Sequence, residues 1–250
     1  MTKIVFIFKQ MQLKQGINII DLALHLPEQN TLVLADLHLG YEEHLRKQGF
    51  MVPWFQYEKI KARLAKIFKQ TGHLEKIIIN GDLKHEFGRI PQQEWEEVLG
   101  LIVFLREHCD ELILIKGNHD VTLGSVAIKK KIEPTSPGLL IGNIYITHGH
   151  KIPENEKIKK AKTVIIGHQH PAIGITDGIT TETYKCFLKG RWSRKDIIVQ
   201  PSFCLVTEGI DILKDGVFSP FLKQKINTFD VYVVADEIMY FGKVKAITAD

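Results

Sequence analysis

Cysteine is scarce in this 250-residue chain, and its three copies, Cys109, Cys186 and Cys204, lie far apart. No pair has the C-x-x-C spacing. An odd and scattered set of cysteines argues against a disulfide framework and against a cysteine-rich zinc ribbon. Such a chain suits a reducing compartment, so we predict a cytoplasmic protein.

The sequence also lacks a long hydrophobic run and a strong charge of either sign. No apolar stretch approaches the roughly 20 residues that a membrane-spanning helix requires, and the N-terminal segment has no small-residue cleavage site. We therefore predict no membrane partner. The net charge of +4 permits an anionic partner without requiring one.

Short apolar runs alternate with amphipathic segments along the first two thirds of the chain. The runs predict strands at 3–8, 17–22, 31–35, 77–80, 112–116, 144–147 and 164–166. Apolar residues at helical spacing predict helices around 57–68 and 95–105. After Pro171 the segments 183–188, 196–200 and 211–213 and a closing hairpin, VYVVADEIMYFG, predict mostly strands. We expect a single α/β domain over residues 1–250, with its strands sandwiched between helices.

Polar side chains follow five of these predicted strands, at the point where each strand ends. The segments are ADLHLG, NGDLKHEFG, KGNHD, THGH and GHQH, and in three of them a glycine separates the strand from the polar residue. Ligands of open α/β sheets gather beyond the carboxyl ends of the strands, and glycine allows close backbone approach. Each fragment alone is a weak signal, but five in this order predict one shared site.

The side chains of these segments offer oxygen and nitrogen donors and no thiolate. They are Asp36, His38, Asp82, Asn118, His148, His168 and His170. Seven donors exceed the needs of one tetrahedral ion but suffice for two ions if one carboxylate bridges them. Mixed imidazole and carboxylate ligands favour Mn²⁺, Fe or Zn²⁺ over Mg²⁺ or Ca²⁺, and paired ions of this kind assist displacement at phosphorus. On extended backbone, His168 and His170 would point to the same side.

The order DLH, GD, GNHD, HGH, GHQH resembles the calcineurin-like metallophosphoesterase superfamily, over a stretch from Ile4 to about Pro171. The segments ADLHLGYEEHLRKQGFMVP, GDLKHEFG, CFLKG and PSF resemble one branch of it, the Icc-related or DNA-ligase-associated phosphoesterases of archaea and bacteria, over nearly the whole chain. The resemblance implies a four-layer αββα sandwich of two mixed sheets flanked by helices. The metal motifs would lie within 31–171, and residues 172–250 would complete the second sheet.

The resemblance also implies roles for the seven donors. One metal ion would be held by Asp36, His38 and His170, the other by Asn118, His148 and His168, with Asp82 bridging both. The two divalent ions are expected to be Mn²⁺, with Fe, Zn²⁺ or Ni²⁺ as alternatives. A hydroxide shared by the ions would attack phosphorus, and His119 would be the acid that serves the leaving oxygen.

Four further residues have two interpretations each. Asp120 either orients His119 or caps a following helix. His150 either contacts the substrate phosphate or supports the neighbouring histidine ligand. His85 lies either near the leaving group or on the surface, and Arg46 is either a phosphate contact or an ordinary arginine on a helix surface.

The expected substrate is a phosphodiester in nucleic acid, including DNA or RNA ends, or in a nucleotide. Protein phosphatases of the superfamily have the pattern GD-x-x-D-R-G, and here GDLKHE lacks the arginine that grips phosphate, which argues against phosphoprotein substrates. The alternative is a phosphomonoesterase or pyrophosphatase acting on a small nucleotide-like substrate. A non-catalytic scaffold is less favoured because all seven donors and His119 are present. The branch also implies a functional link to a ligase or helicase, and the oligomeric state stays open.

Basic residues gather late in the chain, at 129–131, 157–162 and 189–195. If they surrounded the metal cleft, they would attract a polyanion, and Trp192 and Phe187 would be candidates for stacking on bases. The alternative is a solvated charged surface and ordinary core aromatics.

Overall fold

The first of two packed sheets is mixed and carries its strands in chain order. The computed structural model describes residues 10–86, 91–120, 134–176 and 178–247, so the strand predicted at 3–8 lies outside the described residues. The six described strands are β1 (Met11–Lys14), β2 (Ile17–Ile20), β3 (Ala23–Leu26), β4 (Thr31–Leu34), β5 (Leu74–Asn80) and β6 (Cys109–Ile115). β1 to β4 pair antiparallel, whereas β4, β5 and β6 are parallel. The carboxyl ends of the last three strands therefore share one edge.

The second sheet has nine described strands and is also mixed. They are β7 (Leu139–Ile141), β8 (Ile144–Thr147), β9 (Thr163–Ile166), β10 (Pro171–Thr176), β11 (Thr181–Trp192), β12 (Lys195–Val199), β13 (Ile210–Asp211), β14 (Asp230–Val234) and β15 (Ile238–Lys243). Strands β8, β9 and β12 are parallel. Their carboxyl ends lie together, as those of β4 to β6 do in the first sheet.

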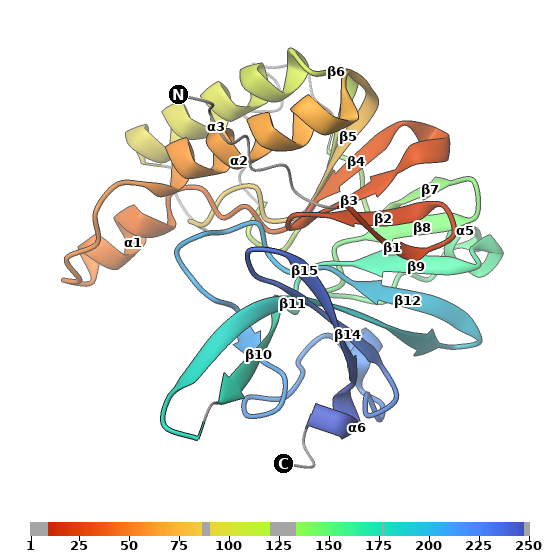
Figure 1. Cartoon of the computed structure of the whole chain (residues 1–250). Helices are drawn as coiled ribbons and strands as arrows, with labels where there is room; N and C mark the ends of the chain where they lie inside the picture. Colours follow the sequence, from red (N-terminus) through yellow and green to blue (C-terminus); the bar gives the residue numbers. More distant parts are fainter. Residues whose placement is uncertain (1–9, 87–90, 121–133, 177, 248–250) are drawn as a thin grey trace, which may run out of the picture.

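Helices cover the two sheets unequally (Figure 1). Helices α2 (Gln56–Thr71) and α3 (Gln92–Arg106) lie over the first sheet. Beyond the second sheet lie only short elements in the described part: α5 (Glu156–Lys160), α6 (Val244–Ile247) and a 3-10 turn at Pro220–Leu222. A third short helix, α1 (Tyr41–Lys47), projects from the body (Figure 1), and a 3-10 turn at Pro27–Gln29 precedes β4. No described helix is long and apolar enough to cross a membrane.

The strands of the second sheet present alternate side chains to two separate cores. Ile146, Ile165 and Ile198 belong to the core shared with the first sheet, whereas Val164 and Ile166 belong to the outer core. This alternation is the period of two that a pleated strand imposes. Because both faces are covered, β8 and β9 are almost entirely apolar, and this is why their sequences predict strands.

The predicted α/β fold with two mixed sheets flanked by helices is confirmed, with a thin outer layer over the second sheet. Strand β8 has the predicted bounds, and β11 extends well beyond 183–188. The prediction missed β1, β3, β10 and α1. β1 and β3 are short and contain polar residues, and β10 begins with proline and contains a glycine. Helix α1, with the sequence YEEHLRK, has no apolar stripe to indicate a helix.

Phe187 lies on β11 in the core between the sheets and has 0% of its surface exposed, so the suggestion that it stacks on bases is wrong. We expect Phe187→Ala to lower the free energy of unfolding by about 3–5 kcal/mol, because it leaves a cavity in a close-packed core. Urea denaturation followed by circular dichroism measures this. Met51→Ala, at a side chain 99% exposed, is the control and should change stability by less than about 0.5 kcal/mol. Equal stability of the two variants would contradict the placement of Phe187.

Candidate metal centre

The loops that leave the carboxyl ends of both sheets are joined by main-chain hydrogen bonds. The amide of Asp36, after β4, donates to the carbonyl of Gly81, after β5, at 3.2 Å, and the amide of His38 donates to the carbonyl of Asp82 at 2.9 Å. In the second sheet the amide of Gly167 donates to the carbonyl of His148 at 2.9 Å. The polar strand ends predicted from sequence are therefore brought together.

Five of the seven predicted donors have left-handed backbone, which side-chain-bearing residues rarely adopt. Their φ angles are 53° for Asp36, 45° for His38, 45° for Asp82, 63° for His168 and 48° for His170. The expectation that His168 and His170 sit on extended backbone and point to one side is wrong, because β9 ends at Ile166. Instead, the two imidazoles join different clusters. Sparsely populated backbone of this kind is concentrated at functional sites.

The three glycines predicted to allow close approach lie directly against candidate ligands. A Cβ at Gly81 would lie 2.1 Å from Nδ1 of His148, and one at Gly117 would lie 2.1 Å from Oδ1 of Asp82. A Cβ at Gly167 would lie 2.5 Å from Oδ2 of Asp36. No real Cβ is found so near another atom, so any other residue would displace a donor.

The first cluster contains Asp36, His38 and His170, each with a donor atom within 4.8 Å of the others. Nε2 of His38 lies 3.3 Å from Nε2 of His170, and Oδ1 of Asp36 lies 3.5 Å from the same His170 atom. The backbone amide of His168 donates to the other Asp36 oxygen at 2.9 Å, so the carboxylate is fixed between the two sheets. These three side chains can hold one ion.

The second cluster contains Asp82, His148 and His168. Nε2 of His148 lies 3.3 Å from Oδ2 of Asp82 and 3.0 Å from Oδ1 of Asn118, which adds a fourth donor. The same Asp82 oxygen lies 3.8 Å from Nε2 of His38 in the first cluster. Asp82 therefore stands between the two clusters, as a carboxylate shared by two ions would.

The burial of the Asp36 and Asp82 carboxylates is consistent with a binding site for cations. Oδ1 of Asp36 is buried and accepts no hydrogen bond from the described residues, a costly state for an anionic oxygen without a positive partner. Although burial opposes protonation, the hydrogen bond to Asp82 and the charge of Asp36 raise the pKa of His148 to about 9. The site thus strongly attracts positive charge, and its hard oxygens and imidazoles suit divalent transition ions.

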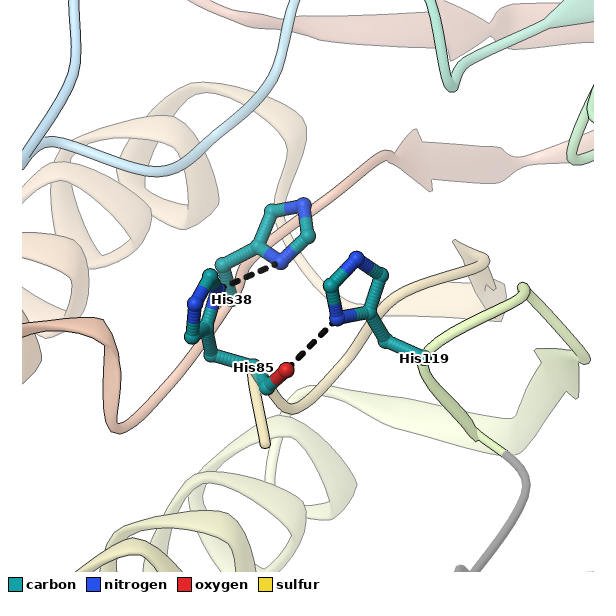
Figure 2. A group of neighbouring side chains, drawn as sticks. All are labelled: His38, His85 and His119. Carbon is teal, nitrogen blue, oxygen red and sulfur yellow. Dashed lines mark hydrogen bonds between the residues drawn. The ribbon is translucent and has the colours of Figure 1, made fainter. Parts of the chain in front are cut away.

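A third group of donor atoms, from His38, His85 and His119, adjoins the first cluster. Figure 2 shows the three imidazoles converging, with Nδ1 of His38 lying 3.4 Å from Nδ1 of His85. Nδ1 of His119 lies 2.6 Å from the carbonyl oxygen of His85, to which it donates, so Nε2 is on the far side of the ring (Figure 2). The backbone amide of His119 donates to Oδ1 of Asp82 at 2.9 Å. His119 is thereby fixed beside both clusters.

Asp120 does not orient His119, so that interpretation is wrong. Its fully buried carboxylate accepts the backbone amides of Leu83 at 3.2 Å and Gly117 at 2.9 Å, and the carbonyl of His85 is what orients the His119 ring. Burial and the nearby charge of Asp82 raise the pKa of Asp120 to about 7. Asp120 ties the loop after β5 to the loop after β6. A helix that it would cap lies outside the described residues.

His85 is a half-buried member of the cluster rather than a surface residue. Its ring stacks on Tyr41 with centroids 4.0 Å apart, and its backbone amide donates to the buried Glu94 at 3.0 Å. Burial, together with the neighbouring His119 and His44, lowers the pKa of His85 to about 4, so the ring is neutral at neutral pH.

His150 lies beside the second donor cluster, whereas Arg46 lies away from both clusters. The ring of His150 is 5.1 Å from that of His148, and its buried Nδ1 has no hydrogen-bond partner among the described residues. Arg46 instead lies near the end of α1, where it donates to the carbonyl of Val52 at 2.9 Å and covers the Trp54 ring at 5.1 Å. The structure brings His150, but not Arg46, to the donor clusters.

The late basic residues do not surround the clusters. Lys195 opens β12 beside the start of β9, where its ammonium donates to the carbonyl of Ala161 at 2.6 Å. Arg191 pairs with Asp196 at that same end. The donors follow the opposite, carboxyl end of β9. These cations therefore lie at the other end of the sheet and cannot guide a polyanion to the donors. Residues 129–131 lie outside the described residues.

Several buried polar residues that hold these loops could not be predicted from the sequence. Lys84 donates to the carbonyl of His119 at 2.8 Å, Glu94 accepts the amides of His85 and Glu86, and Gln56 donates to the carbonyl of His38 at 2.9 Å. Lys84 sits inside the GDLKHE segment, but Glu94 and Gln56 are isolated polar residues on helices. Nothing in the sequence distinguishes them from residues on a solvated helix face.

The family model for the calcineurin-like phosphoesterase domain matches residues 30–191, which include every donor described above, and this chain belongs to that family. It is accordingly a metal-dependent phosphoesterase. The chain is similar in fold to the Pseudomonas putida nuclease MPE, with 18% identity, a TM-score of 0.66, and coverage of 94% of this chain and 100% of that chain. YfcE, a phosphoesterase from E. coli, is 16% identical, with a TM-score of 0.40 and coverage of 87% and 98%. No curated protein sequence matches the chain.

The close approach at Gly81 can be tested with Gly81→Ala. The new Cβ would collide with the His148 ring, so we expect bound metal and activity to fall by on the order of 10- to 100-fold. Gly142→Ala is the matched control, since Gly142 also has positive φ but has nothing within 4 Å of its Cβ position. Metal content by mass spectrometry and melting temperature separate loss of the site from unfolding. Full metal content in Gly81→Ala would refute the geometry.

Proposed function

We propose that the protein hydrolyses phosphodiester bonds in nucleic acid or nucleotides with two divalent metal ions. The observation that carries the proposal is the position of Asp82, whose Oδ2 lies 3.3 Å from His148 in one donor cluster and 3.8 Å from His38 in the other. A shared carboxylate between two mixed nitrogen and oxygen clusters is the arrangement that a pair of ions requires.

Each donor has a defined part in this proposal. One ion would be held by Asp36, His38 and His170, the other by Asn118, His148 and His168, with Asp82 contacting both. When bound, such a pair lowers the pKa of a water molecule and neutralises charge on the phosphoryl oxygens. The donor set favours Mn²⁺, with Fe, Zn²⁺ or Ni²⁺ as alternatives.

His119 is proposed as the acid for the leaving oxygen. Its Nδ1 donates to the carbonyl of His85, so the proton to be transferred is carried on Nε2. Because the His119 amide donates to Asp82, the acid keeps a fixed position relative to the shared carboxylate. His150 lies beside the second cluster, where it can contact a substrate oxygen, and His85 holds His119 through its carbonyl group.

The loop after β5 favours a diester over a monoester. Where protein phosphatases of the family carry the arginine that grips phosphate, this chain has Glu86, with His85 before it in place of the acidic residue. Lys84, the nearest lysine in sequence, is buried and donates to backbone carbonyls. A site without this arginine loses more stabilisation of a phosphomonoester dianion than of a diester, which has a single charge.

The experiment compares bis-p-nitrophenyl phosphate, single-stranded DNA, p-nitrophenyl phosphate and pyrophosphate, each with Mn²⁺. We expect diester cleavage to exceed monoester cleavage. Asp82→Asn should lower kcat/KM by on the order of 100-fold or more, since even residues outside the ligand set contribute 10- to 100-fold. Asp110→Asn, at an exposed carboxylate paired with His73, is the matched control and should retain activity.

Three results would contradict this proposal in different ways. Monoester or pyrophosphate turnover without diester cleavage would favour the phosphomonoesterase alternative. Protein that binds neither Mn²⁺ nor Zn²⁺ and cleaves nothing would favour a scaffold. Unchanged activity in Asp82→Asn would move the active site elsewhere.

His119→Ala should affect substrates according to their leaving groups. A general acid typically contributes 10²- to 10⁴-fold, so we expect kcat on single-stranded DNA, with its alkoxide leaving group, to fall by about that factor. Hydrolysis that releases p-nitrophenolate, a good leaving group, should fall much less, and bound metal should be retained. His73→Ala is the control at an exposed histidine. Equal loss on both substrates would exclude an acid role for His119.

A further inference from the structure

Phe218 is a large apolar side chain at the edge of the second donor cluster. Its ring centroid lies 5.1 Å from that of His168, with the two planes at 87°, and 47% of the residue is exposed. The ring therefore contacts a candidate metal ligand by an edge-to-face arrangement while about half of its surface faces solvent. The nearby Phe221 and Phe229 are buried, so this segment is able to place phenyl rings in the core.

The backbone around Phe218 is fixed by hydrogen bonds to the loops that carry the donors. The amides of Phe218 and Ser219 both donate to Oε1 of Gln169, at 2.9 and 3.1 Å. Gln169 is fully buried and lies between His168 and His170, and the Ser219 hydroxyl donates to the carbonyl of Gly149 at 2.8 Å. Phe218 is thus held in place beside the clusters by contacts made through its neighbours and its own amide, not by burial of its ring.

An exposed phenyl ring in a fixed position suits one kind of ligand group. Leaving such a ring in water forgoes the free energy that burial of its apolar surface would gain. A flat nucleobase recovers this surface by stacking, and base–aromatic stacking is worth about 1–3 kcal/mol per base in proteins that bind single strands. A phosphate or inorganic pyrophosphate has no such flat apolar face.

We propose that Phe218 is a stacking subsite for the nucleobase next to the scissile phosphate, on the side of the second donor cluster. The inference rests on the proposed function and narrows its substrate to a base-bearing strand. The proposal gives the stacking role to Phe218 and not to Trp192. The Trp192 ring packs on Phe221, with centroids 4.7 Å apart, and strand β11 ends at Trp192 away from the donors.

The experiment measures the contribution of the base directly. A single-stranded oligonucleotide and a strand of equal length with tetrahydrofuran sugars in place of the nucleosides are cleaved with Mn²⁺, and the ratio of their kcat/KM values is taken. In the wild type we expect the base-bearing strand to be preferred. Phe218→Leu keeps an apolar contact with His168 but removes the flat ring, so the ratio should fall by about 5- to 100-fold.

Two variants and a metal measurement distinguish stacking from packing. Phe218→Trp, which restores a flat ring, should keep the wild-type preference, and Tyr240→Leu, at an aromatic 54% exposed on β15, should also keep it. If Phe218→Leu lowers kcat/KM equally on both strands together with bound Mn²⁺, Phe218 only supports His168 and the inference is overturned. Equal cleavage of both strands by the wild type overturns the inference and leaves the proposed phosphodiesterase intact. Cleavage of neither strand overturns both.

Discussion

Two buried carboxylates, Asp36 and Asp82, set the electrostatic problem that the rest of the site answers. Both lie among histidines from the opposite sheet, and an oxygen of Asp36 accepts no hydrogen bond from the described residues. In a poorly solvated environment this charge must be balanced, and part of the balance is visible as the raised pKa of His148. Divalent ions supply the remainder more completely than a single proton can. The arrangement of histidines around the two carboxylates is best understood as a response to this excess of negative charge.

The fold makes the meeting of these residues possible because parallel strands end at one edge. Strands β4 and β5 deliver Asp36 and Asp82, while β8 and β9 deliver the histidines from the facing sheet. The loops approach so closely that glycine is required between strand and donor, as at Gly81 against His148. The left-handed backbone of the donors costs additional conformational free energy, and the packing of the two sheets on either side offsets it.

The clustering of the candidate donors could be predicted because their chemistry restricts them to a few residue types at strand ends. Its errors arose where burial or strand direction decided the outcome. Phe187 has an aromatic type suited to stacking but points into the core, and Lys195 follows the right motifs in sequence but lies at the other end of the sheet. Asp120 follows the proposed acid directly, yet its carboxylate bonds to the backbone of two loops. The position of Phe218 could not be predicted from the sequence, because its contact with His168 depends on a hydrogen bond to Gln169, about fifty residues away in the chain.

The two oxygens of Asp82 would connect metal binding to the proposed proton transfer. Oδ2 faces histidines of both clusters, while Oδ1 accepts the backbone amide of His119. A shift of this carboxylate would therefore move the proposed acid together with the ions. The ring of His119 is fixed independently by the carbonyl of His85, whose amide is held by Glu94 on α3. The proposed acid is thus positioned from the donor clusters through its backbone and from helix α3 through its ring. This dual support would keep a side chain on a loop within the narrow range of positions that general acid catalysis requires.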